Sequence, residues 1–153
     1  MEAVIGKSLV PIFQSEKSGR VEEDRNYVLV AKERQDTGRP NDWGYPIRGI
    51  ISDDFVHLKN FKPDCWPTRR AETGYLDCDG SPTKTAITDA YNTDYHKLWA
   101  LSFGKREAEE FFDLKKDPDC VDNIASENSY EKNRTYWSEL LKQKLTEQAD
   151  PRF

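Results

Sequence analysis

The sequence lacks the features by which membrane proteins, exported proteins and general nucleic-acid binders are usually recognised. No stretch of the 153 residues approaches the ~20 consecutive apolar residues that a membrane-spanning helix needs. The first seven residues lack the basic start and the apolar run of a signal peptide. With 28 acidic and 23 basic residues, the chain has a formal net charge of -5 and no basic surplus for nucleic acid. We therefore expect a domain that binds neither membranes nor nucleic acid.

Cysteine and histidine are also scarce. The three cysteines are Cys65, Cys78 and Cys120, none of them in a Cys-x-x-Cys pair, and the two histidines are His57 and His96. A structural zinc site needs more ligands at closer spacing than these residues supply. A disulfide between Cys65 and Cys78 is compatible with the sequence but cannot be argued from it, so the redox state of the three cysteines stays open.

Aromatic residues, in contrast, are plentiful. The chain has 4 Trp, 7 Tyr and 7 Phe, which is too many for a disordered chain although 33% of the residues are charged. A single domain of this length can bury roughly 70% of the surface that its unfolded chain exposes. The composition therefore predicts one folded domain.

The pattern of apolar residues predicts an α+β fold. In the terminal segment, Tyr130, Trp137, Leu141 and Leu145 recur at helical spacing, which indicates a long amphipathic helix that needs a surface to pack on. Short apolar and β-branched runs predict four strands, at 26–32, 47–52, 55–61 and 110–114. We expect a small four-stranded antiparallel sheet packed against the long C-terminal helix, with additional short helices near 81–91 and 94–104.

A long loop between the first two predicted strands carries the clearest binding chemistry. Arg34, Arg39 and Arg48 lie on or beside it, together with Trp43 and Tyr45. Arginine recognises sulfate, carboxylate or phosphate through two parallel hydrogen bonds, and the aromatic rings offer flat faces to sugars. This combination is typical of one wall of a site for an anionic carbohydrate.

The same loop also permits a purely structural interpretation. Its arginines could pair with Glu33, Asp36 and Asp42 on a solvated loop that contacts no ligand. Composition alone does not separate these two interpretations.

A second pattern, Cys65-Trp66-Pro67-Thr68-Arg69, matches the Cys-x-Pro-x-Arg motif in which formylglycine-dependent sulfatases carry their nucleophile. In those enzymes the motif opens a helix and an apolar run follows, whereas residues 70–74 here provide no such run. The Asp53-Asp54 pair imitates a metal-binding carboxylate pair, but it lies in a tight turn shortly before Cys65. We interpret Cys65 as a loop cysteine beside a packing tryptophan.

The order of motifs along the chain resembles the C-terminal subdomain of the sulfatase family, in the branch that includes heparan N-sulfatases (N-sulfoglucosamine sulfohydrolases). The resemblance runs almost from end to end of the chain. It rests on the segments Gly6-Lys7-Ser8-Leu9, Glu33-Arg34, Arg39-Pro40, Gly44-Tyr45-Pro46-Ile47-Arg48, Asn60-Phe61-Lys62-Pro63, Glu72-Thr73-Gly74-Tyr75-Leu76, Cys78-Asp79-Gly80-Ser81-Pro82-Thr83-Lys84, Phe112-Asp113-Leu114 with Asp117-Pro118, and Asn123-Ile124-Ala125.

The resemblance implies a fragment of a larger enzyme. Residues 1–25 would be a connecting segment from a missing catalytic domain, and residues 26–153 the α+β subdomain. The calcium and the formylglycine of the family would belong to that missing domain, so this chain would hold no cofactor and would be inert alone. Its partners would be the catalytic domain and a sulfated saccharide, and the full-length protein would be periplasmic or extracellular.

The resemblance also implies a role for the loop. The chain would contribute Glu33, Arg34, Arg39, Tyr45 and Arg48 to the rim of the substrate site. Relatives in this branch usually carry His after the Glu-Arg pair, whereas this chain has Gln at position 35, which leaves the choice of saccharide open.

Removal from a parent domain would expose the surface that was buried against it. We expect an apolar patch that a neighbouring copy in a crystal or a dimer could cover. Two other interpretations remain: a stand-alone module that binds anionic sugars or another partner, and a structural subdomain whose loops contact no ligand.

Overall fold

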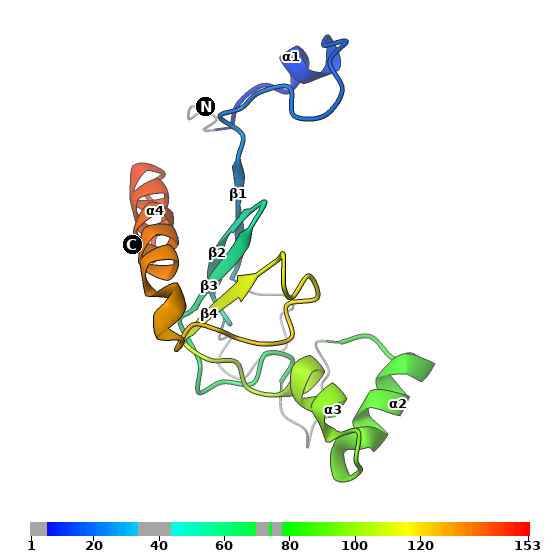
Figure 1. The fold of residues 1–153 in the computed structure, drawn as a ribbon. Coiled ribbons are helices and arrows are strands. Elements are labelled where there is room, and N and C mark those ends of the chain that lie inside the picture. The colour runs from blue at the N-terminus through cyan, green and yellow to red at the C-terminus, as the bar shows by residue number, and fades with distance from the viewer. Residues whose placement is uncertain (1–5, 34–43, 70–73, 75–77) are drawn as a thin grey trace.

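The computed structural model describes residues 6–33, 44–69, 74 and 78–153 of the chain. Its centre is a four-stranded antiparallel sheet in which each strand pairs with its neighbour in sequence (Figure 1). The strands are β1 Tyr27–Lys32, β2 Ile47–Ser52, β3 Phe55–Asn60 and β4 Glu109–Asp113. The α+β fold that the sequence predicts is confirmed.

The Asp53-Asp54 pair lies in the tight turn of the hairpin that β2 and β3 form. The Ser52 hydroxyl accepts hydrogen bonds from the backbone N–H groups of Asp54 (3.3 Å) and Phe55 (2.9 Å). It also lies 3.1 Å from the Phe55 carbonyl, to which it donates. Serine thereby holds the turn with its side chain, a common device in tight turns.

One face of the sheet forms the main core with helix α4, Glu131–Glu147, which follows the short 3₁₀ helix η4, Asn128–Tyr130 (Figure 1). Ile50 of β2 packs with Leu141 and Leu145 of α4, and Leu29 and Trp137 border this cluster. The helical spacing in the sequence thus identified the residues that α4 buries.

A second, smaller cluster lies around the helices between β3 and β4. Trp99 and Phe103 of α3 pack there with Trp66 and Ile87. The helices, which lie side by side away from α4 (Figure 1), are α2 Pro82–Asp89, η3 Ala90–Asn92 and α3 His96–Phe103. The Ser81 hydroxyl caps α2 by accepting a hydrogen bond from the N–H of Lys84 at 3.0 Å, and Pro82 occupies the first helical position, an order of residues that favours a helix start.

Residues 6–25 form an arm that runs away from the sheet and contains the single-turn helix α1, Val10–Phe13 (Figure 1). Arg20 joins the arm to the β2–β3 turn through an ion pair with Asp53 at 2.5 Å. The apolar side chains of Leu9, Val10 and Phe13 are exposed. The arm therefore carries apolar surface that the described part of the chain does not cover.

The two edges of the sheet differ. The side chain of Asn123 lies along β4, where its oxygen accepts from the Phe111 N–H (2.9 Å) and its amide donates to the Glu109 carbonyl (3.1 Å). The N–H of Ile124 donates to the Phe111 carbonyl at 2.9 Å. Within the described residues, no strand pairs with the outer edge of β1.

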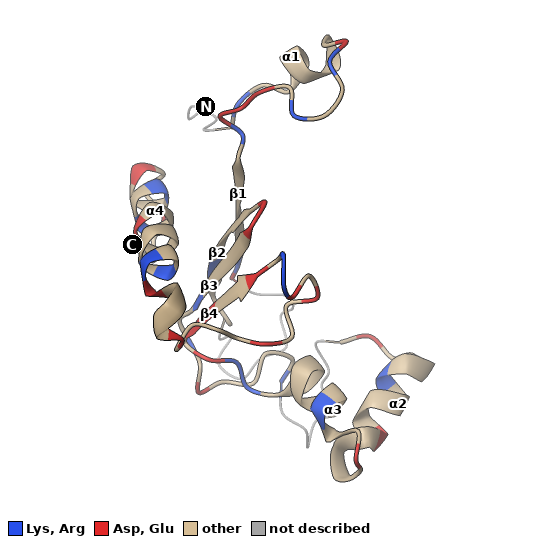
Figure 2. Cartoon of the chain, viewed as in Figure 1, with Lys and Arg blue, Asp and Glu red and all other residues tan. Residues whose placement is uncertain are grey.

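Charges of both signs are interspersed along the chain rather than gathered on one element (Figure 2). Among the described helices, none combines the length and the apolar character that crossing a membrane requires.

Candidate functional site

The candidate site lies where the chain leaves β1 and returns to β2. The backbone N–H of Tyr45 donates to the Glu33 carbonyl at 2.8 Å, which fastens together the two ends of the segment between them. Gly44 permits this approach, because a Cβ atom there would lie 2.7 Å from the Glu33 carbonyl oxygen. We call this junction the loop base. The predicted rim residues Arg34 and Arg39 lie between its two ends, outside the described residues.

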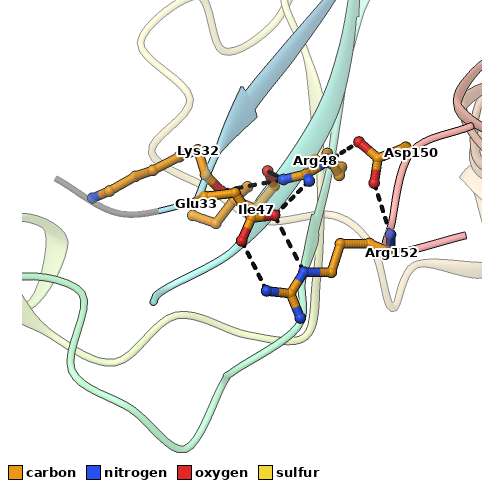
Figure 3. Close-up of polar contacts among 6 residues, drawn as sticks. All are labelled: Lys32, Glu33, Ile47, Arg48, Asp150 and Arg152. Carbon is orange, nitrogen blue, oxygen red and sulfur yellow. Dashed lines mark hydrogen bonds and ion pairs between the residues drawn. The ribbon is translucent and has the colours of Figure 1, made fainter. Parts of the chain in front are cut away.

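Arg48 is the central cation of the loop base (Figure 3). Its Nε donates to Asp150 at 2.7 Å and its Nη2 to Glu33 at 2.5 Å. Its Nη1 donates to the backbone carbonyls of Ile47 (3.0 Å) and Lys32 (3.3 Å). The side chain is only 3% exposed, so these bonds replace the water that the guanidinium loses on burial. Its carboxylate partners hold the pKa of Arg48 above its ordinary value despite that burial.

A second arginine reaches the loop base from the segment after α4. Arg152 binds Glu33 with two donors, Nη2 at 2.8 Å and Nε at 3.2 Å, in the bidentate geometry typical of arginine and carboxylate (Figure 3). Its side chain is 39% exposed. The hydrogen bond from Arg152, together with Arg48, lowers the pKa of Glu33 from 4.5 to about 2. Arg48 likewise lowers the pKa of Asp150.

Tyr45 is fully buried beside this cluster. Its hydroxyl oxygen accepts a hydrogen bond from the Asn60 side-chain amide at 2.8 Å, and the Lys32 ammonium lies 5.8 Å from the centre of its ring. Burial raises the pKa of the Tyr45 phenol. The ring therefore packs inside the loop base and presents no face to a sugar.

The structure thus brings together three of the predicted site residues, Glu33, Tyr45 and Arg48. Glu33 alone of these three reaches the surface, while Tyr45 and Arg48 hold the two strand ends in place. The ion pair between Arg48 and Glu33 agrees with the structural interpretation of the loop, in which its arginines pair with its carboxylates. Sequence reasoning missed Asp150 and Arg152, because partners 102 and 119 positions away leave no local pattern.

Cys65 lies in an irregular segment, as predicted, and not at the start of a helix. The neighbouring Trp66 packs edge-to-face on Trp99, with ring centres 6.2 Å apart, which confirms a loop cysteine beside a packing tryptophan. Cys65, Cys78 and Cys120 are free thiols.

The resemblance would place the calcium and the formylglycine of the family in a catalytic domain outside this chain. In the described part of the chain, no group of three or more His, Cys, Asp or Glu side chains is arranged to hold a metal ion.

The chain was compared with models of known protein families and with curated proteins, and neither comparison found a match.

Proposed function

We propose that the chain is the C-terminal subdomain of a sulfatase similar to heparan N-sulfatases, an enzyme that hydrolyses sulfate from a sulfated saccharide outside the cytoplasm. The loop base carries the proposal, because it is a built structure at the point where the family resemblance places the substrate rim. The α+β architecture, with one helix packed on a four-stranded sheet, is the one that the resemblance implies.

In this proposal the loop base positions residues that contact substrate. Glu33 and Tyr45 fasten the ends of the loop, and Arg48 fixes Glu33 from beneath. Arg34 and Arg39, which lie between the fastened ends, would supply the charged contacts to the sulfated sugar. Because the loop ends are held in advance, ordering the loop on a ligand would cost less conformational entropy, which suits a binding loop.

Exposed apolar side chains in two places support a role beside a catalytic domain. The arm at 6–25 exposes Leu9, Val10 and Phe13, as expected of a connecting segment that packs on another unit (Figure 1). Val28, on the sheet face opposite α4, is 58% exposed although it lies within a strand. These residues are candidates for the apolar patch that a separated subdomain would show.

The first test is the genomic sequence upstream of the codon for Met1. An open reading frame that encodes an apolar strand ending in Asp-Asp, followed by a Cys-x-Pro-Ser-Arg motif, is the expected result. A stop codon and a ribosome-binding site directly before Met1 would overturn the subdomain proposal and favour a stand-alone module.

A second test uses the 153-residue chain itself. Incubated with an N-sulfated glucosamine disaccharide, it should release no sulfate, since by this proposal the nucleophile lies in the catalytic domain. Calorimetric titration with the same disaccharide and with its desulfated form separates the alternatives. Sulfate release would contradict the proposal, and tight binding that depends on the sulfate would favour an independent binding module.

A further inference from the structure

His57 is a buried histidine between the sheet and α4. It lies on the sheet face that packs against α4, opposite Ile50 of β2 and Phe111 of β4, and its side chain is only 1% exposed. Its Nε2 is 2.9 Å from Glu109, and the other oxygen of that carboxylate accepts from Arg134 of α4 at 2.9 Å. His57, Glu109 and Arg134 therefore form a chain of polar contacts from β3 through β4 to the first half of α4.

The two ring nitrogens of His57 have different surroundings. A carboxylate can only accept, so Nε2 carries the proton and donates to Glu109. Nδ1 is buried and has no hydrogen-bond partner among the described residues. A proton added at Nδ1 would create a buried donor without an acceptor, which is costly in an apolar environment.

The charges around the ring do not compensate for a second proton. Glu109 is already neutralised by Arg134, and Lys59 lies on the same face of β3. β2 faces the ring with the apolar Ile50, and the Phe111 ring of β4 lies 6.1 Å away, centre to centre. A protonated His57 would thus be a third cation beside one carboxylate.

We propose that His57 is a proton-sensitive contact between the sheet and α4, whose protonation loosens the first half of α4. This inference is independent of the proposed enzymatic function. The rest of α4 stays anchored through Leu141 and Leu145.

The sign of the pH dependence follows from the burial of the ring. Desolvation lowers the pKa of His57 below 6.5, against the opposing effect of Glu109. The unfolded chain, with an ordinary histidine, takes up the proton first. Stability is therefore complete above about pH 6.5 and falls as the pH drops toward the folded-state pKa. If local opening of α4 takes up a single proton, its equilibrium constant can rise by at most about tenfold for each pH unit of acidification.

The window from about pH 7.5 to pH 5.5 isolates this proton, because unperturbed carboxylates titrate near pH 4. With only two histidines, a proton NMR titration resolves the ring of His57 from that of His96. Amide hydrogen exchange, corrected for intrinsic rates, then compares residues 131–138 with residues 139–147. We expect a pKa below 6.5 for His57 and a severalfold loss of protection at acidic pH, confined to 131–138.

Two variants separate the effect of protonating His57 from a general effect of acid on the chain. His57→Gln keeps a donor for Glu109 but cannot titrate, so its protection should not change across the window. His96→Gln is the matched control, and it should lose protection in 131–138 at acidic pH as the wild-type chain does. A pKa for His57 at or above 6.5, or an equal loss of protection in His57→Gln, would overturn the proposal. If His57→Gln does not fold, the NMR titration and the hydrogen exchange of the wild-type chain decide together: a pKa below 6.5 with a loss of protection confined to 131–138 supports the proposal, and the lack of either result overturns it.

Discussion

Replacing Arg48 with methionine tests how much of the stability depends on the loop base. Methionine retains much of the side-chain volume but leaves Asp150 without the guanidinium, 2.7 Å away, that neutralises it. Removing one partner of a fully buried ion pair typically costs 3–5 kcal/mol. Glu33 keeps Arg152, and the Asp150 side chain is 14% exposed, so we expect the lower end, about 3 kcal/mol in the free energy of unfolding.

The chain contains a matched control for this experiment. Arg152 binds the same carboxylate as Arg48, but its side chain is 39% exposed and its ion pair is screened by solvent. Arg152→Met should therefore cost less than about 1 kcal/mol. Urea denaturation at neutral pH, followed by both tryptophan fluorescence and far-UV circular dichroism, measures the two values.

A double variant separates the loss of the pair from the loss of packing. In Arg48→Met with Asp150→Met, no buried charge is left unpaired, so the cost should be smaller than the sum of the two single costs by about 1 kcal/mol or more. If Arg48→Met costs no more than Arg152→Met, or if the two single costs simply add, the burial argument for Arg48 is refuted.

Three further predictions concern the loop base and α2. Glu33→Gln should destabilise the chain by about 1 kcal/mol near pH 6, because the half-exposed carboxylate loses its charge. The pKa of Glu33 is lowered to about 2 in the folded chain, so the contribution of its carboxylate to stability is complete above about pH 4.5 and should vanish as the pH falls toward 2. Urea titrations of the wild type and of Glu33→Gln at several pH values measure this contribution, and a difference that does not change with pH would show the reasoning to be wrong. Gly44→Ala should cost about 1–3 kcal/mol, since the new Cβ would clash with the Glu33 carbonyl, and an unchanged melting temperature would contradict that geometry. Ser81→Ala should cost about 1 kcal/mol by removing the cap on Lys84, to be measured by thermal unfolding with Ser81→Asp as the variant that retains a capping oxygen.

Much of the fold was predictable because its signals are local. The Asp53-Asp54 turn, the Ser81 cap and the spacing of Leu141 and Leu145 each depend on residues within a few positions of one another. Antiparallel neighbours in sequence then leave few ways to assemble the sheet. The terminal helix had to pack on that sheet, since no other apolar surface of sufficient size was predicted.

The candidate site was predictable only in part, because its contacts are not local. The motif around Tyr45 and Arg48 indicated where the site lies, but residue types alone do not distinguish a guanidinium that binds a ligand from one that binds a distant carboxylate. In the sequence, Asp150 indicates only the end of a helix, because a proline follows it. Its role becomes apparent when the fold brings it to Arg48. The polar chain from His57 to Arg134 was hidden for the same reason.

The asymmetry of the sheet edges limits how this molecule can associate with itself through its backbone. Asn123 and Ile124 occupy the hydrogen-bonding groups along β4, whereas within the described part of the chain no strand pairs with the outer edge of β1. Two copies meeting edge to edge could pair only β1 with β1, and both ends of the combined sheet would then be capped β4 strands. Such an assembly would stop at a symmetric dimer, because growth into a fibre would need a second sheet edge at which strands can pair.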